Sequence, residues 1–218
     1  MCCAIPFRNP GSFIHFLSDV MVTIAITGGI ACGKSLVGRY MKELGLPVCE
    51  ADELGHAVLA GDGESYAAVV GEFGPTIVGA DGGIDRARLG ALVFSVPEKL
   101  ERLNALTHPA IMRRLRAWIV NQPAGTGYVA AVIPLLHEIQ DEGHWDVVVC
   151  VTSPQSDQMR RLEERGLAEN EAEARIRSQF DQSRKMESSD YVIHNCGSQD
   201  LLREQTVRVV RSIRGEAS

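Results

Sequence analysis

The feature that most constrains this chain is the stretch Gly28–Ser35, whose sequence GGIACGKS fits the pattern G-x-x-x-x-G-K-[ST]. This pattern is typical of a loop that binds the phosphates of a nucleoside triphosphate. The residues before it, 22–27, form an apolar, β-branched run that predicts a buried parallel strand. The residues after it place Leu36, Tyr40 and Met41 at helical spacing. Because the motif requires a strand, a glycine loop and a helix in this order, a chance match in an ordinary glycine-rich turn is the weaker interpretation.

The chemistry of such a loop follows from its residue types. Glycines let the backbone curl so that several N–H groups point inward at phosphate oxygens, and the following helix directs its positive end at the same anion. Lys34 is expected to place a positive charge at the β- and γ-phosphates, and Ser35 to offer an oxygen ligand to Mg²⁺. The nucleotide-contacting residues are expected to be Gly29, Ile30, Ala31, Cys32, Gly33, Lys34, Ser35 and Leu36.

Composition narrows the class of partner. The chain has 218 residues and a formal net charge of −6. Non-specific binding to nucleic acid depends on surplus Lys and Arg, so an acidic chain is a poor candidate for it. An anionic small molecule is still a suitable ligand, because backbone N–H groups and a few cations build a phosphate site locally.

The chain shows no membrane or secretion signal that we recognise. No run reaches the ~18–20 apolar residues of a membrane span, and the apolar piece within residues 1–20 is too short for a signal peptide. We expect residues 1–20 to be a dispensable extension and Met21 to begin the folded part. The six cysteines form no C-x-x-C pair, so we expect reduced thiols and a cytoplasmic location. Cys32, inside the loop, is interpreted as a small filler residue rather than an oxidation-sensitive thiol.

The second predicted strand, residues 46–49, ends beside two carboxylates, Glu50 and Asp52. Ligands of open α/β sheets lie at the carboxyl ends of the strands, so Asp52 is expected to face the phosphate loop. A carboxylate there can accept a proton from an attacking hydroxyl group or hold Mg²⁺. The alternative is a helix N-cap for a helix that begins near Glu53. The two roles are compatible, and the spacing alone does not separate them.

A helical block without strands follows, and we expect it to be an insertion, residues 54–125, that covers the site or binds a second substrate. Pro109 is expected to open a new helix, which would place His108 at a helix junction. A single His is more often structural than functional. Arginines 113, 114 and 116 are expected to form an ordinary solvated face.

The strands resume at 128–133 and 146–152. The third strand ends in Ile133-Pro134 without an acidic residue, so a bound metal would depend on Ser35, Asp52, water and the nucleotide. After the fourth strand come Arg160, Arg161 and Arg165, and then a helix with Glu–Arg pairs at i,i+4 spacing. This segment, 153–187, is interpreted as a lid whose arginines, chiefly Arg165, close over the phosphates. The alternative is an ordinary exposed helix stabilised by ion pairs.

A fifth strand, 191–195, and a closing helix, 201–213, complete the pattern. The alternation predicts an α/β fold of three layers with a five-stranded parallel sheet and right-handed crossovers. The nucleotide core would comprise residues 21–53, 126–152 and 188–218. A phosphate loop, a helical insertion and an arginine-bearing lid together indicate phosphoryl transfer to a small acceptor.

Six motifs in this order make the chain similar to the dephospho-coenzyme A kinase family, from Met21 to about Ile213. They are TGGIACGKS, EADELGH, LNALTHP, IPLLHE, EAEARIRSQ and DYVIHN. The resemblance implies a fold like that of the nucleoside monophosphate kinases. It also implies phosphorylation of the ribose 3′-hydroxyl of dephospho-CoA by ATP, with Mg²⁺, in the last step of coenzyme A synthesis.

The resemblance further implies roles for single residues. Residues Gly28–Ser35 would bind ATP, Asn195 would lie near the adenine, and Asp52 would be the base or would orient the ribose hydroxyl. Lys34 and Arg165 would stabilise the transferring phosphoryl group. The acceptor site would contain Asp52, Arg86, His108, Pro134, Leu135 and Leu136. We expect a monomer with no nucleic-acid or membrane partner, although an oligomer stays open.

The chain departs from the family pattern at three points. Glu50 replaces the first Asp of the usual D-A-D, Leu36 replaces a hydroxyl residue, and Gly166 follows Arg165 where an Asp is usual. Two rival functions stay open at this point. One is another small-molecule kinase of the shikimate or nucleotide type. The other is a nucleotide-dependent regulator, although the chain has no N-K-x-D motif for reading guanine.

Overall fold

The computed structural model describes residues 21–94, 96–138 and 145–216, and the chain divides into two compact units. The first unit comprises residues up to Glu50 and from Pro123 onward, and the second is Ala51–Gln122. The extension expected over residues 1–20 lies outside the described residues. The strands are β1 (Val22–Gly28), β2 (Val48–Glu50), β3 (Tyr128–Val132), β4 (Val147–Thr152) and β5 (Tyr191–His194). The helices of the first unit are α1 (Lys34–Glu43), α6 (Gln155–Glu163), α7 (Glu169–Arg177), α8 (Gln182–Glu187) and α9 (Gln199–Ile213).

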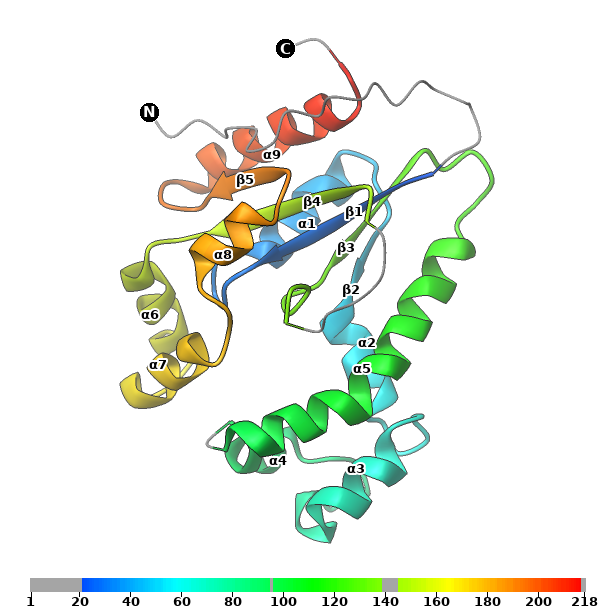
Figure 1. The fold of residues 1–218 in the computed structure, drawn as a ribbon, viewed down its shortest axis with the longest axis vertical. Helices are drawn as coiled ribbons and strands as arrows, with labels where there is room; N and C mark the ends of the chain where they lie inside the picture. Colours follow the sequence, from blue (N-terminus) through cyan, green and yellow to red (C-terminus); the bar gives the residue numbers. More distant parts are fainter. Residues whose placement is uncertain (1–20, 95, 139–144, 217–218) are drawn as a thin grey trace. The chain divides into compact units, whose positions relative to one another are not determined.

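The first unit is built on a five-stranded sheet in the order β2-β3-β1-β4-β5, in which every neighbouring pair is parallel (Figure 1). β1 lies at the centre and pairs with β3 on one side and β4 on the other, with Ile24 opposite Ala130 and Val147. The α/β fold and the five parallel strands predicted from the sequence are confirmed. The strand ends differ from the predicted ones by one or two residues, because local patterns define the middle of a strand better than its ends.

The core of this unit lies between the sheet and helices α1 and α9. Successive strand residues point to opposite faces, so Ile24 and Ile26 of β1 lie on the same face of the sheet. They belong to one buried cluster with Val37 and Met41 of α1 and with Leu202 of α9. The short helix α8 contacts β1 and β4 separately from this cluster. The core thus fixes the start of α1, and with it the position of the phosphate loop.

The second unit consists of helices α2 (Ala51–Val58), α3 (Tyr66–Phe73), α4 (Arg86–Val93) and α5 (Pro97–Val120), with a short 3₁₀ turn, η1 (Pro75–Ile77). Its own core contains the buried side chains of Val69, Ile77, Leu89 and Val93. Asp85 is the N-cap of α4, and its carboxylate accepts a hydrogen bond from the N–H of Arg88, a role that suits Asp.

Two predictions about these helices are wrong. α2 already begins at Ala51, so Asp52 lies within its first turn and is not its N-cap. α5 runs without interruption through Pro109, so His108 lies inside a helix and not at a junction. Proline removes one backbone hydrogen bond and tends to kink a helix, but tertiary packing can carry the helix past it. α5 is held by its contacts with α2 and α4, and it changes direction along its length (Figure 1).

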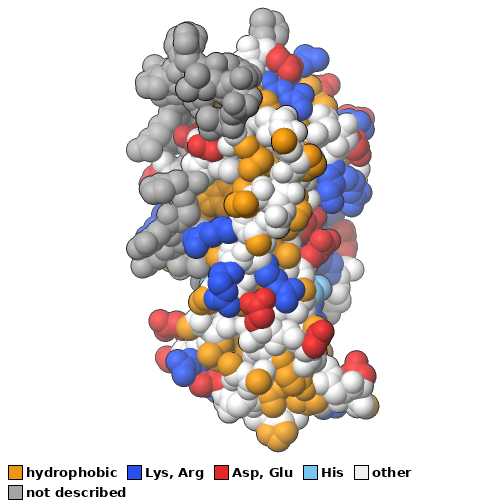
Figure 2. Space-filling view, turned by 90° about the vertical axis from the view of Figure 1, so that its right-hand side faces the viewer, with side chains coloured by type: hydrophobic (Ala, Val, Ile, Leu, Met, Phe, Trp, Pro, Cys, Tyr) orange, Lys and Arg blue, Asp and Glu red, His pale blue; other side chains and the backbone are white. Residues whose placement is uncertain are grey.

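Two of the arginines of α5 share one ion-pair partner. Arg113 and Arg114 both contact the carboxylate of Glu64, at 3.1 and 2.9 Å, and these bonds lower the pKa of Glu64. On the described part of the face shown in Figure 2, basic and acidic side chains alternate and do not form a continuous basic surface. Within the described residues, no helix is both long enough and apolar enough to cross a membrane.

Candidate active site

The loop between β1 and α1 has the curled backbone that phosphate binding requires. Gly28 and Gly33 have φ values of +138° and +97°, and Ala31 between them has +57°, the one positive value among the described non-glycine residues. A Cβ atom on Gly28 would lie 2.0 Å from the carbonyl oxygen of Val151 in β4. Only glycine fits there. A backbone in this conformation directs consecutive N–H groups to one side, which is the geometry of an anion site.

Lys34 holds its positive charge inside this loop. Its side chain is buried, and Nζ donates hydrogen bonds to the carbonyl oxygens of Gly28 at 3.0 Å and Gly29 at 2.8 Å. A buried cation is stable only where acceptors surround it. The loop carbonyls therefore keep the ammonium group beside the N–H groups that bind anions.

Ser35, at the start of α1, is hydrogen-bonded to Glu50, at the end of β2. The Ser35 hydroxyl donates to Glu50 Oε2 at 2.8 Å. This contact directs the serine proton at the carboxylate and leaves the lone pairs of Oγ available. Hydroxyl and carboxylate oxygens are ligands that Mg²⁺ prefers. The described residues contain no cluster of three or more His, Cys, Asp or Glu side chains that could hold a metal ion. The donors thus fit an Mg²⁺ ion that takes its other ligands from phosphate and water.

Asn195, at the end of β5, supports the loop directly. Its side chain is buried, and Nδ2 donates to the carbonyl oxygen of Cys32 at 2.9 Å. A Cβ atom on Gly33 would lie 2.5 Å from the same nitrogen. The carbonyl of Asn195 accepts a short hydrogen bond from Ser153 Oγ. The amide that was expected near the adenine is therefore used to hold the loop.

Of the three arginines that follow β4, Arg161 contacts the loop. Its guanidinium donates to the carbonyl of Ala31 at 2.9 Å and to Ser153 Oγ at 2.8 Å. Arg160 instead pairs with Asp157 and Glu164 at the surface of α6. Arg165 lies exposed in the turn after α6, and its guanidinium makes no hydrogen bond or ion pair to the other described residues. Sequence reasoning grouped the three but chose Arg165, because side-chain direction on a helix is not visible in spacing alone.

Helices α6 and α7, in the segment interpreted as a lid, pack on the tip of the loop. Ala31 belongs to a small apolar cluster with Leu162 of α6 and Ala172 of α7, and Ile30 lies against it. On the outer surface of α7, Arg177 pairs with Glu173 at 3.0 Å, as the i,i+4 spacing predicts. One face of this segment thus bears an ion pair and the other contacts the loop, and its role as a lid stays a prediction.

Gln182 of α8 is a supporting residue that the sequence did not single out. Its Oε1 accepts from Thr152 Oγ1 at 2.6 Å, from Ser153 N–H at 3.0 Å and from the Cys32 thiol at 3.3 Å. Burial raises the pKa of Cys32, so its thiol is poorly ionised. This environment favours the filler interpretation of Cys32, because reactivity requires a thiolate.

A buried ion pair holds the turn after β3 in place. This turn includes Pro134, Leu135 and Leu136. Lys185 of α8 is fully buried, and its Nζ donates to Glu138 Oε1 at 2.7 Å and to the carbonyl of Pro134 at 3.0 Å. Removing either charge would leave the other buried without its partner, which is costly. No sequence signal marked Lys185, since buried and exposed lysines look alike in a helical pattern.

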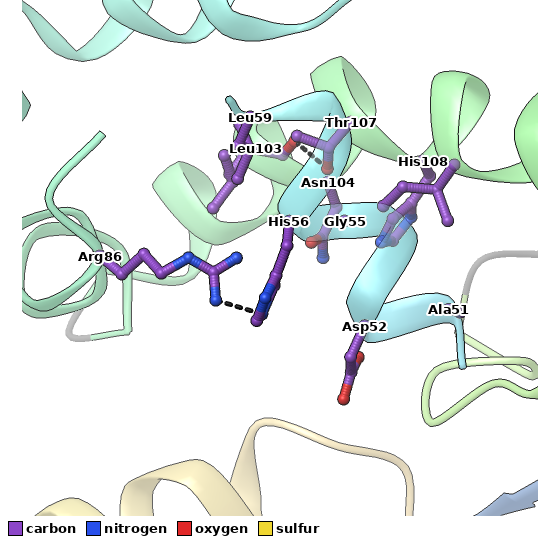
Figure 3. Close-up of a pocket in the computed structure, with 11 residues that line it drawn as sticks. Ala51, Asp52, Gly55, His56, Leu59, Arg86, Leu103, Asn104, Thr107 and His108 are labelled. Atoms are coloured by element: carbon purple, nitrogen blue, oxygen red, sulfur yellow. Dashed lines mark hydrogen bonds between the residues drawn. The ribbon is translucent and has the colours of Figure 1, made fainter. Parts of the chain in front are cut away.

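The second unit contains a pocket of about 290 Å³ between α2, α4 and α5 (Figure 3). Three predicted residues, Asp52, Arg86 and His108, line it together. The remaining lining residues are Ala51, Gly55, His56, Leu59, Leu103, Asn104, Thr107 and Ile111. The structure thus brings the predicted acceptor residues of this unit into one site, while Pro134, Leu135 and Leu136 belong to the first unit.

Arg86 and His56 point toward each other across the pocket (Figure 3). A short hydrogen bond joins Arg86 Nη1 to His56 Nε2, so the ring accepts there and carries its proton on Nδ1. Desolvation lowers the pKa of His56, and the charge of Arg86 lowers it further. Asp52 opposes both effects, because its negative charge raises the pKa of His56 and of Arg86. The pocket therefore holds a guanidinium group oriented by a neutral imidazole, with a carboxylate nearby.

His108 projects from α5 beside Asn104 (Figure 3). Burial lowers its pKa, so its ring is neutral at physiological pH and can donate or accept a hydrogen bond. The pocket therefore offers a cation, a carboxylate and neutral imidazoles to a polar ligand.

The chain is similar to known proteins both in sequence and in structure. The sequence profile of the family described as Dephospho-CoA kinase matches residues 22–200. The chain is 42% identical to the dephospho-CoA kinase of Geobacillus kaustophilus over 194 residues, which cover 87% of this chain and 96% of that protein. It is 38% identical to the Carboxydothermus hydrogenoformans enzyme of the same name, with 88% and 94% covered.

Two solved structures are similar as well. The protein TT1252 from Thermus thermophilus has a TM-score of 0.73 and 32% identity, with 88% of this chain and 97% of that chain covered. The dephospho-CoA kinase from Campylobacter jejuni has a TM-score of 0.60 and 27% identity, with 88% and 98% covered.

Proposed function

Because the chain belongs to the dephospho-CoA kinase family, we propose that it transfers the γ-phosphoryl group of ATP to the ribose 3′-hydroxyl of dephospho-CoA. This reaction gives coenzyme A and ADP. The observation that carries the proposal is the family match over residues 22–200, which includes both the phosphate loop and the pocket of the helical unit. The family resemblance predicted from the motifs is confirmed, and this confirmation sets aside the rival kinase classes and the regulator.

The donor site comprises the loop Gly28–Ser35 with Lys34. In this proposal the loop N–H groups bind phosphate oxygens, and Lys34 neutralises charge on the β- and γ-phosphates. Arg161 adds a second cation beside Ala31. Phosphoryl transfer requires positioning and charge stabilisation more than covalent help from the protein, so preorganised N–H groups and cations supply most of the rate. Arg165 remains a proposed lid residue that would add charge from the turn after α6.

Magnesium would be held by Ser35. Glu50 would accept a hydrogen bond from the serine hydroxyl and add negative charge near the ion. A bound Mg²⁺ ion would neutralise the charge that develops on the phosphates. Glu50 replaces the shorter Asp of the family pattern, and its longer side chain still reaches Ser35 Oγ at 2.8 Å.

The acceptor pocket, lined by Asp52, His56, Arg86 and His108, would bind dephospho-CoA. Asp52 would accept the proton of the attacking hydroxyl or orient it, since a carboxylate in this role typically contributes a factor of about 10²–10⁴. Arg86 would contact an anionic part of the substrate, because a guanidinium group can form bidentate hydrogen bonds with phosphate oxygens. His108 would hydrogen-bond the substrate, and residues 134–136 would contribute apolar contacts.

We further propose a monomer that works in the cytoplasm. Cys32 and Cys150 are buried thiols outside any disulfide, which fits a reducing compartment. Burial raises the pKa of Cys150 to about 12, so this thiol stays protonated.

The proposal is tested by measuring ADP release with ATP, Mg²⁺ and a panel of acceptors, which are dephospho-CoA, shikimate and nucleoside monophosphates. We expect stimulation by dephospho-CoA alone and a product heavier by one phosphoryl group at the 3′ position. Stimulation by another acceptor, or ATP binding without turnover on any of them, would contradict it.

A further inference from the structure

The segment after α7 reaches one of the N–H groups of the phosphate loop. Gln179 lies just beyond α7, and its Oε1 accepts a hydrogen bond from the backbone N–H of Ile30 at 2.9 Å. Ile30 belongs to the loop and lies far from Gln179 in the sequence. Ile30 N–H belongs to the same run of loop amides that is expected to bind phosphate, so the Gln179 carboxamide lies next to that run.

The assignment of the two ends of the Gln179 amide follows from this contact. Only the oxygen can accept the Ile30 proton, so the NH₂ group lies on the other arm of the same carboxamide. This NH₂ group makes no hydrogen bond to any of the described residues and is not buried. Because the oxygen is bonded to Ile30 and the nitrogen has no partner among the described residues, the side chain offers two N–H donors beside the loop.

The chain around Gln179 is held in place from several directions. The N–H of Phe180 donates to Glu138 Oε1 at 3.0 Å, and the guanidinium of Arg184 lies 3.8 Å above the Phe180 ring. Asp181 caps α8 by accepting from Ser183 N–H at 2.8 Å. Donors held in advance of the reaction stabilise charge without a cost of reorganisation.

From these contacts we propose that Gln179 binds the γ-phosphoryl group of ATP. Its Oε1 holds Ile30, and its Nε2 donates to a γ-phosphoryl oxygen that becomes more negative during transfer. The assignment rests on the proposed use of ATP as phosphoryl donor. It adds a neutral donor to the cations Lys34 and Arg161, and it comes from the segment that otherwise covers the loop tip.

Gln182 provides a matched comparison, because it too is a glutamine of this segment whose oxygen contacts the loop. Its Nε2 already donates to the carbonyl of Ser153 at 3.0 Å. Ser153 therefore orients the Gln182 amide and uses one of its two N–H donors, whereas neither N–H donor of Gln179 has a partner among the described residues. A role in holding the loop is common to both residues, and a role in binding phosphate is specific to Gln179.

The test compares the Kd of ATP with the Kd of ADP, both with Mg²⁺, in the wild type and in Gln179→Glu. Glutamate keeps an acceptor for Ile30 and loses the donors. We expect ATP to bind about 10- to 100-fold more weakly, the range for a lost hydrogen bond to a charged group. ADP, which lacks the γ-phosphoryl group, should change less than threefold. Equal weakening of both nucleotides, or no weakening of either, would overturn the proposal.

Two further variants keep the test decisive if the first is unstable. Gln179→Lys restores a donor without an acceptor for Ile30, so it should keep the wild-type preference for ATP over ADP; loss of that preference would overturn the proposal. Gln182→Glu should alter ATP and ADP binding together, and a selective loss of ATP binding in it would also count against the assignment. Turnover of dephospho-CoA by the wild type is measured first, so failure of the proposed function is recognised separately from failure of this assignment.

Discussion

The donor site around Gly28–Ser35 is made mostly of main chain, whereas the pocket at Asp52, Arg86 and His108 is made of side chains. The loop requires glycines at fixed positions because a Cβ on Gly28 would meet the carbonyl of Val151 at 2.0 Å. The pocket draws its side chains from three helices that are separated in the sequence. A main-chain site is therefore encoded in one short motif, and a side-chain site depends on the packing of a whole unit.

The largest effect is expected from Gly28→Ala. Backbone strain and the clash with β4 should together lower the free energy of unfolding by about 2–6 kcal/mol, and ATP binding should be lost. The matched control is Gly45→Ala, with φ +85° and no atom within 4 Å of its Cβ, which should cost about 1–2 kcal/mol. Urea unfolding of both variants measures the difference. Equal losses of unfolding free energy in the two variants would show that the close approach of Gly28 to Val151 adds no cost beyond the strain of a positive φ.

Asp52→Asn tests the other side of the comparison. We expect kcat to fall by about 10²–10⁴ while the Kd of ATP is retained, because the change removes a proton acceptor and leaves the loop intact. Glu53→Gln, at the neighbouring exposed carboxylate of α2, serves as control and should keep its turnover. Steady-state kinetics and calorimetric titration with ATP give both numbers. Normal turnover in Asp52→Asn would exclude Asp52 as the base.

Arg86→Gln should separate the two sites by substrate. Loss of a charge-assisted hydrogen bond should raise the KM for dephospho-CoA about 10- to 100-fold and leave the KM for ATP unchanged. Arg88→Gln is the matched control, since Arg88 lies on the same helix and pairs with Asp85 at the surface at 3.1 Å. A parallel rise in both KM values would mean that Arg86 maintains the unit rather than binding the substrate.

The smallest effect concerns His108 and pH. Burial lowers its pKa in the folded state, so the unfolded chain binds the proton more readily. The stability from the neutral ring is complete above the unfolded value of 6.5 and is lost as the pH falls from there toward the lower folded pKa. His108→Asn should flatten the decline in Tm between pH 7.5 and 5.5. An identical decline in both proteins would show that His108 does not contribute to it.

The contrast also explains what the sequence could and could not predict. Five parallel strands follow from local patterns, and this prediction of the fold is confirmed. The roles expected for the phosphate loop and Ser35 also come from a local motif, and they stay predictions. The continuous α5 could not be predicted, because a proline favours a helix boundary unless packing overrides it. Gln182 and Lys185 were missed because their importance depends on contacts with distant segments. For the same reason Arg161 was named only as one of three arginines, and its contact with the loop was not predicted. His56 was missed for the same reason, because only the folded unit brings it to Arg86.

The central place of β1 has a consequence for the order in which the chain folds during synthesis. Its two partners, β3 and β4, follow the entire helical unit in the sequence, so they leave the ribosome long after β1 does. Contacts within residues 51–122 are local by comparison and form early. We therefore expect the helical unit to fold on the ribosome first. The apolar segment Val22–Ile26 stays exposed until β3 and β4 have been synthesised and can pair with it. β1 is translated before the other four described strands and is thus among the last of them to be buried. In this interval the nascent chain most needs a chaperone.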